Sequence, residues 1–298
     1  MKRVIIGILA ALLLISIWYL FVKKYDYEIS FKANLAPIGV YHQVKNIKSN
    51  TQKSQSLNQN LGDINLTQEV VLNDEIVFLD WNFKSVNDTV TKIKVGVISK
   101  DHSIKNKLQV IIGSSPVVKL VKKDLIQLRK TLRKYTDTFK IIVEGETQIP
   151  AMDFLSISSK TKRSRKAHEM MSQNSYLYPK LVSGNVDRKG YPFVKINNWN
   201  LDTDELQMDF GVPIILKDSL PVNSIINLTR AETQNALKAT YYGNYRTSYE
   251  AWFVLLEYAR VNKIVVENEP LEIFYNNPMQ DGNDSQWKAE VYLPLKNK

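Results

Sequence analysis

The chain has 298 residues, of which 44% are hydrophobic and 23% charged, so it is long enough for about two domains with packed cores and is not intrinsically disordered. It contains no cysteine, which excludes a disulfide scaffold, a thiolate zinc site and a cysteine nucleophile. The formal net charge is +10, and the three histidines are scattered, which leaves little material for a histidine-based metal site.

The first predicted element is a membrane-spanning helix over residues 4–22. These 19 residues carry no charge, and at about 1.5 Å per residue such a helix just crosses a hydrocarbon core of roughly 30 Å. The alternative is a cleaved signal peptide, whose apolar stretch is shorter and ends in small residues, whereas this one continues into Trp18, Tyr19 and two lysines. We therefore expect a single-pass anchor in the cell membrane over residues 1–24. Two cations flank each end, so the side on which the rest of the chain lies stays open.

The excess of positive charge lies in the anchor and the segment beside it. Residues 25–143 hold 18 Lys and Arg against 11 Asp and Glu, whereas residues 144–298 hold 18 against 19. Anionic lipid headgroups attract such a basic segment, although an ordinary lysine-rich solvated surface has the same composition. Nucleic acid is the other partner that this charge suits. The sequence shows no recognition-helix, zinc-finger or aromatic RNA-binding motif, so we expect no nucleic-acid partner.

Residues 25–143 predict a small α+β domain. A strand at 25–33 and a helix at 35–47 are followed by a polar, low-complexity stretch at 48–63, which favours a loop. An antiparallel meander of strand-like runs follows, at 68–73, 75–86, 89–100 and 107–113.

A long helix closes this segment. Ser115 is its N-cap, Pro116 lies in its first turn, and apolar residues at spacings of three and four extend it to Phe139. This order of elements resembles the helix-grip fold of the START-like (polyketide cyclase-like, SRPBCC) family, with YEISFKANLAPIGVYHQVKNI similar to its entry and DWNFKSVNDTVTKIKVGV similar to its late strand pair. The polar stretch stands where that family has a second helix and further strands. A ligand-binding domain and a spacer without a cavity are therefore equal alternatives.

The second half, residues 144–298, predicts two passes of strand, helix, strand, strand. The first pass comprises 147–160, a helix near 165–183, 191–199 and 205–216. The second comprises 224–243, a helix at 247–261, 270–277 and 287–295. Thr247 and Glu250 have the spacing of a capping box at the start of the second helix. Two such α+β repeats build an antiparallel sheet with helices on one face and a cleft between the repeats.

Four motifs of this half resemble the GyrI-like effector-binding domains. KATYYGNYRTSYEAWFVLLEYARVNKI is similar to their strand, Gly-x-Tyr and long helix, with Gly243 and Tyr245 at the motif positions. LEIFYNNP is similar to their Glu-x-Tyr-x-x-Asx-Pro strand at Glu272, and WKAEVYLPL to their last strand at Glu290. YPFVKINNWNLDTDELQMDFGVPI is similar to their strand pair that ends in Gly-Val-Pro. Four motifs in the family's order make the resemblance specific.

The resemblance implies a concave, aromatic-lined pocket between the repeats that binds lipophilic, often cationic, small molecules, as in multidrug binding. The carboxylate at its floor would be Glu272. Strand alternation places Phe274 on the same face, and a carboxylate among aromatic rings loses solvation that a bound cation would offset. The candidate pocket walls are Tyr242, Trp252, Trp199 and Tyr245. By residue type alone, a strand Glu is usually exposed, and aromatics of a helix stripe usually belong to the core.

We therefore expect a membrane-anchored protein that binds or senses a lipophilic small molecule. Two alternatives stay open: a hydrolase of a strained or toxic lipophilic compound that uses Glu272 with Tyr242, and a non-catalytic module that binds protein or lipid. Phe274 stands where hydrolases of the family carry a proton-donating Tyr, which favours binding without catalysis. We see no catalytic triad, phosphate loop, HExxH motif or Gly-rich cofactor loop, so we expect no metal and no cofactor.

Overall fold

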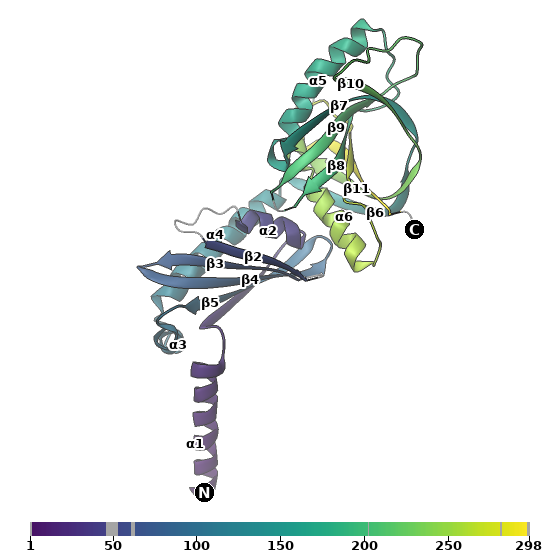
Figure 1. The fold of residues 1–298 in the computed structure, drawn as a ribbon. Coiled ribbons are helices and arrows are strands. Elements are labelled where there is room, and N and C mark those ends of the chain that lie inside the picture. Colours follow the sequence, from purple (N-terminus) through teal and green to yellow (C-terminus); the bar gives the residue numbers. More distant parts are fainter. Residues whose placement is uncertain (1, 46–52, 61–62, 202, 281, 297–298) are drawn as a thin grey trace. The chain divides into compact units, whose positions relative to one another are not determined.

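The computed structural model describes residues 2–45, 53–60, 63–201, 203–280 and 282–296. The chain divides into two compact units, residues 1–134 and 135–298 (Figure 1). Each unit combines helices with an antiparallel sheet, so the protein belongs to the α+β class.

The N-terminal apolar segment is a helix, as predicted. Helix α1 (Lys2–Ile17) continues into one π-helical turn, η1 (Trp18–Val22). The 21 residues have a mean hydropathy of 2.7, and none of their most apolar stretch is buried inside the protein. Length and composition therefore suit a membrane span, and a signal sequence has the same properties.

The first unit contains a five-stranded antiparallel sheet. Its strands, in spatial order, are β1 (Tyr27–Ala33), β5 (Val90–Ser99), β4 (Glu75–Asn87), β3 (Asp63–Leu72) and β2 (Lys53–Asn60). Helix α2 (Pro37–Lys45) packs on β3, β4 and β5. Helix α4 (Pro116–Thr136) begins where predicted, because the Ser115 hydroxyl accepts a hydrogen bond from the Val118 amide at 3.2 Å. Its predicted apolar stripe is buried from Val118 to Leu132.

Three predictions for the first unit were wrong. The run 107–113 is not a strand: residues up to Ile111 belong to helix α3 (Ser103–Ile111), which the Asp26 side chain holds through Ser103 and Asn106. Part of the expected loop, residues 53–60, forms edge strand β2, because backbone pairing with β3 needs no apolar pattern; 48–52 lie outside the described residues. The final helix ends at Thr136, and Phe139 begins a strand.

The second unit contains one eight-stranded antiparallel sheet. Its strands along the chain are β6 (Phe139–Ile149), β7 (Met152–Lys162), β8 (Phe193–Asn200), β9 (Glu205–Pro213), β10 (Ile226–Ala231), β11 (Gln234–Gly243), β12 (Leu271–Phe274) and β13 (Lys288–Pro294). Their spatial order is β10-β7-β9-β8-β12-β13-β11-β6. The segment 224–243 therefore forms two strands, where the sequence predicted one.

Two helices pack on this sheet. Helix α5 (Lys166–Ser183) contacts β7 and β9, and helix α6 (Glu250–Val261) contacts β6, β11 and β13 (Figure 1). The predicted capping box does not form. A 3-10 turn, η3 (Tyr245–Thr247), precedes α6, and the Thr247 hydroxyl bonds to Tyr241 and to the Asn244 carbonyl instead. The helix starts one turn later than expected because these local hydrogen bonds engage the Thr247 hydroxyl, which then does not cap the helix.

Candidate functional site

Glu272, the predicted pocket carboxylate, lies in the middle of the second sheet. It sits on β12 opposite Val194 of β8 and Val291 of β13, and its exposed fraction is 0%. Moving a carboxylate from water into such surroundings costs several kcal/mol unless the charge finds a partner. The identity of that partner therefore decides what the site can do.

The partner of Glu272 is Lys166. The Lys166 ammonium donates to Glu272 Oε2 at 2.5 Å and to the Ser248 hydroxyl at 2.7 Å, and that hydroxyl lies 2.6 Å from the same carboxylate oxygen. The side chains of Lys166 and Glu272 are 2% and 0% exposed. Burial lowers the pKa of Lys166, while the charge and hydrogen bond of Glu272 act in the opposite direction. The result is a fully enclosed ion pair.

Two helix starts position this pair. Lys166 is the first residue of α5, and Ser248 lies two residues before α6. The N-terminal end of a helix carries a partial positive charge, which favours a carboxylate and disfavours a lysine. The dipole of α5 therefore does not stabilise a cation at its first position. The charge of Glu272 supplies that reason.

Aromatic rings enclose the ammonium group. Lys166 Nζ lies 5.2 Å from the centre of the Trp252 ring and 5.5 Å from that of Phe274, within the range of cation–π attraction. Trp199 packs edge-on against Trp252 at 5.3 Å, and Tyr245 packs on Phe274 at 4.7 Å. We call this group, together with Glu272 and Ser248, the Glu272 cluster. It brings together five of the six site residues predicted from the sequence.

The Glu272 cluster retains unused hydrogen-bonding groups. Among the described residues, Glu272 Oε1, Trp199 Nε1 and Trp252 Nε1 have no hydrogen-bond partner although they are buried. Buried polar atoms are paired in the great majority of cases, and an unpaired one costs about 1–3 kcal/mol. One acceptor and two donors therefore lie around the ion pair without a partner.

The sixth predicted residue, Tyr242, does not belong to the cluster. Tyr241 pairs with Ala289, which pairs with Phe274, so Tyr241 shares the face of Glu272 and the next residue, Tyr242, points to the opposite face. The expectation that Tyr242 lines a pocket with Glu272 was therefore wrong. The run LKATYYG contains two adjacent tyrosines, and sequence alone does not say which one faces inward.

Tyr245 lies in the cluster but is fixed by the backbone. Its hydroxyl donates to the Lys288 carbonyl at 2.8 Å and accepts from the Asn276 amide at 2.9 Å. It is 2% exposed. These contacts give Tyr245 a packing role and leave its ring face, not its hydroxyl, to the site.

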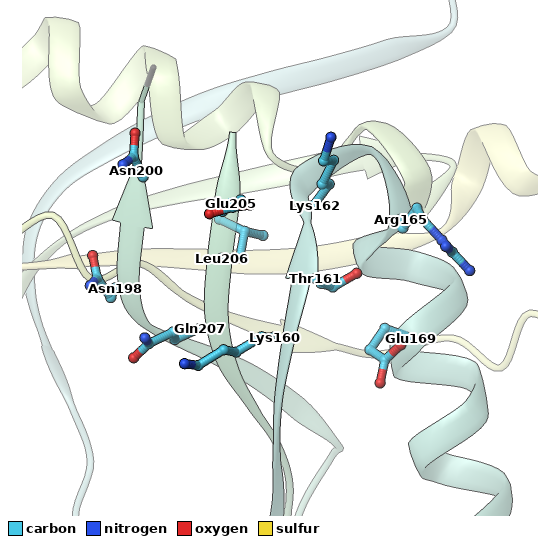
Figure 2. Close-up of a pocket in the computed structure, with 10 residues that line it drawn as sticks. All are labelled: Lys160, Thr161, Lys162, Arg165, Glu169, Asn198, Asn200, Glu205, Leu206 and Gln207. Atoms are coloured by element: carbon cyan, nitrogen blue, oxygen red, sulfur yellow. The ribbon is translucent and has the colours of Figure 1, made fainter. Parts of the chain in front are cut away.

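The Glu272 cluster is closed, in contrast to the concave pocket that the sequence predicted. A polar depression of about 550 Å³ lies elsewhere in the second unit (Figure 2). Its lining residues are Lys160, Thr161, Lys162, Arg165, Glu169, Asn198, Asn200, Glu205, Leu206 and Gln207. It contains none of the six predicted residues, and charged and amide groups take the place of aromatic rings. This surface therefore suits a lipophilic ligand poorly.

A second carboxylate, Glu290, lies on the opposite face of the sheet from Glu272. Its Oε2 accepts from the hydroxyls of Tyr275 and Tyr292, both at 2.8 Å, and its Oε1 lies 2.9 Å from Lys288 Nζ and 3.1 Å from Lys238 Nζ. Burial alone would raise the pKa of Glu290, but these hydrogen bonds outweigh it and lower the pKa to about 2. Glu290 is thus a charged group whose acceptors are already satisfied. Because side chains alternate along a strand, Glu290 and Tyr292 of KAEVYLP lie on the same face of β13.

A third carboxylate, Glu250, is buried in the first turn of α6. It accepts a hydrogen bond from the Tyr135 hydroxyl at 2.6 Å. Burial raises the pKa of Glu250 to about 7, although the Tyr135 hydrogen bond and the nearby charge of Arg163 act against it. Arg163 itself forms a bidentate pair with Asp204 and lies over the Tyr249 ring at 4.2 Å. No group of acidic and histidine side chains among the described residues has the arrangement of a metal site.

Comparisons with known proteins found similarity to solved structures, and none to protein-family models or curated proteins. The C-terminal domain of EcmrR is similar at 14% identity and a TM-score of 0.42, covering 54% of this chain and 99% of that one. A structure of EcmrR in a complex with DNA is similar at 12% identity and a TM-score of 0.46, and the match covers 66% of this chain and 72% of the EcmrR chain.

A third similar structure is SAV2435 bound to tetraphenylphosphonium. It is 10% identical, with a TM-score of 0.37, and covers 52% of this chain and 94% of its own. None of these TM-scores reaches 0.5, so the similarities do not by themselves assign a fold family or a function to this chain.

Proposed function

We propose that this chain is a membrane-anchored binding protein whose second unit takes a lipophilic small molecule at the Glu272 cluster. The observation that carries the proposal is the position of the Lys166 ammonium between Glu272, Trp252 and Phe274. A carboxylate and two aromatic rings around a positive charge are the surroundings that a lipophilic cation requires. The protein fills this position with its own lysine, and a ligand must displace it.

The energetics of the ion pair are compatible with displacement. Burial opposes the charge on Lys166, and one oxygen of Glu272, Oε1, has no hydrogen-bond partner in the described part of the chain. A lysine that leaves the cluster regains its hydration, which offsets part of the lost attraction. A ligand whose cation is shielded by apolar groups pays little hydration to enter, so it competes better than a small hydrated ion.

The strand order supports a two-repeat, GyrI-like architecture for the second unit. Strands β7-β9-β8 of the first half and β12-β13-β11 of the second occupy adjacent, mirrored positions in the sheet. The five-stranded sheet with α2 packed on it, together with the buried apolar stripe of α4, in turn supports a helix-grip, START-like first unit that serves as a spacer. We propose an anchor over residues 1–24 followed by two domains. The limits predicted for these domains were 25–143 and 144–298, but residue 143 lies inside β6, which belongs to the sheet of the second unit, so we place the boundary at 134/135.

Anchoring by α1 and η1 is part of the proposal. The ammonium of Lys107, a buried residue of α3, donates to the carbonyls of Leu20 and Lys23 at 3.1 and 2.6 Å. Removal of residues 1–22 as a signal peptide would take one of these two acceptors away. This contact favours a retained helix.

Tetraphenylphosphonium is a suitable probe because it joins one positive charge to four apolar rings. Binding is measured by tryptophan fluorescence of the full chain in detergent micelles, for the wild type, Lys166→Met and Lys166→Met/Glu272→Gln. Lys160→Met, in the polar depression, is the matched control for loss of an exposed lysine. Circular dichroism checks that each variant is folded.

We expect Lys166→Met to bind tetraphenylphosphonium at least about tenfold more tightly than the wild type, because the internal competitor is gone. The double variant should lose this gain, and Lys160→Met should bind as the wild type does. Neutral triphenylphosphine oxide should discriminate less between the single and double variants. Equal affinity of folded Lys166→Met and wild type, or a gain that survives Glu272→Gln, would defeat the proposal. That result would favour a module whose interior is simply filled by its own side chains.

A further inference from the structure

Helix α3 carries its polar side chains on the inside and its apolar side chains on the outside. Asn106 and Lys107 are each 3% exposed, whereas Leu108 and Ile111 are 49% and 65% exposed. Ile112, directly after the helix, is 76% exposed. A helix on the surface of a water-soluble protein shows the reverse arrangement. The outer face of α3 therefore calls for an apolar environment.

The buried contacts of α3 fix this orientation. Asp26 is fully buried, and its Oδ2 accepts from the Asn106 side chain and the Ser99 amide, both at 2.9 Å. The Ser103 hydroxyl donates to the other carboxylate oxygen, Oδ1. Rotating α3 to hide its apolar face would remove the Ser103 and Asn106 hydrogen bonds and leave the buried Asp26 carboxylate with the Ser99 amide. The helix is therefore held with its apolar face outward.

Helix α3 also lies against the end of the apolar N-terminal helix (Figure 1). The Lys107 ammonium donates to the carbonyls of Leu20 and Lys23, which the helix end leaves without intrahelical partners. Lysine near a helix C-terminus is favourable for the same reason. The apolar face of α3 thus begins beside the point where the 21-residue apolar segment ends.

We propose that α3 is an interfacial helix, whose residues Ile104, Leu108, Ile111 and Ile112 insert into the lipid leaflet from which the N-terminal helix emerges. The inference rests on the anchoring proposed above. The occupant is lipid because Lys107 ties α3 to the end of the apolar N-terminal helix, where that helix would leave the bilayer, and because Lys105, exposed beside the apolar face, suits the headgroup region. The first unit would then be held at the membrane by two elements, which restricts its rotation.

The absence of cysteine makes each introduced cysteine the only thiol for labelling. An environment-sensitive fluorophore is placed in four full-length variants: Leu108→Cys and Ile112→Cys on α3, Leu13→Cys in α1, and Val86→Cys as the matched control. Val86 is exposed by 50%, but its hairpin lies at the end of the sheet away from Tyr27, because β5 pairs Tyr27 with Val97 and Ala33 with Thr91. The vesicles contain phosphatidylcholine and phosphatidylglycerol, with or without brominated acyl chains.

We expect brominated lipid to quench the labels at positions 108 and 112 at least about twofold, and to leave the label at position 86 unchanged. Labels on α3 that behave like position 86 while position 13 is quenched would overturn the proposal and leave the anchor intact. If position 13 also escapes quenching, the anchor itself fails and the interfacial helix with it. A blue shift on α3 without quenching by lipid would show that protein covers the helix, which also overturns the proposal.

Discussion

The ammonium of Lys166 lies 2.5 Å from a carboxylate oxygen of Glu272, and neither side chain is more than 2% exposed. Such a pair contributes little net stability relative to apolar residues of the same shape, but breaking it by removing one partner is costly because the other charge stays buried. The relationship therefore leads to a stability prediction as well as to a function.

Lys166→Met should destabilise the second unit by about 3–5 kcal/mol, because it leaves Glu272 buried and unpaired. The double variant Lys166→Met/Glu272→Leu should recover most of this loss, since both charges are gone. Urea unfolding of the full chain in micelles, followed by tryptophan fluorescence, measures both. Additive losses in the double variant would mean that the two residues do not form a buried pair.

The stability of the second unit should fall as the pH rises from about 4.5 to about 7. Burial raises the pKa of Glu250 from 4.5 to about 7, so over this range the folded carboxyl keeps a proton that the unfolded chain has lost. The folded state is therefore favoured at low pH, and about 3 kcal/mol is lost by pH 7, above which the contribution is constant. Glu250→Gln, which keeps an acceptor for Tyr135, should flatten the profile. A profile of the variant that matches the wild type at every pH would exclude Glu250 as the titrating group.

Asp26→Ala should release helix α3. The substitution leaves Ser103, Asn106 and the Ser99 amide without their acceptor, at a cost of about 2–4 kcal/mol. Hydrogen exchange should quicken in residues 103–111 more than in the five-stranded sheet. Asp101→Ala, at an exposed turn residue, is the control. Equal exchange in both variants would mean that Asp26 does not hold the helix.

The N-terminal helix should persist in the mature protein. Intact mass measurement on protein extracted from membranes should show residues 1–22 still attached. A mass that begins shortly after Val22 would identify a signal peptide, remove the Leu20 acceptor of Lys107 and contradict the anchor.

Sequence patterns predicted the elements whose periodicity is strong. The stripe of α4 and the strands β4, β5 and β13 follow directly from the spacing of apolar residues. KLQVIIG failed because a short apolar run suits a strand or a helix. The helical form is stabilised by hydrogen bonds to Asp26, about 80 residues earlier in the chain, and no local sequence pattern contains that contact. β2 was missed because its polar side chains carry no alternation.

The Glu272 cluster was predicted in part. Motif resemblance pointed to Glu272, and alternation placed Phe274 beside it, as the register confirms. Lys166 could not be found in this way, because the run KTKRSRK reads as an ordinary solvated basic segment and a lysine at a helix start opposes the dipole. Only the fold brings this lysine to a carboxylate 106 residues away.

The most direct test of the central claim is the chemical reactivity of the Lys166 amine. The full chain is treated with an amine-reactive reagent, with and without tetraphenylphosphonium, and modification of each lysine is read by peptide mass spectrometry. We expect Lys166 to be protected in the free protein and to become at least about tenfold more reactive when the ligand is bound, while exposed lysines such as Lys160 and Lys105 do not change. Binding of the ligand with Lys166 still protected would show that it does not take the place of the lysine beside Glu272, and would contradict the account.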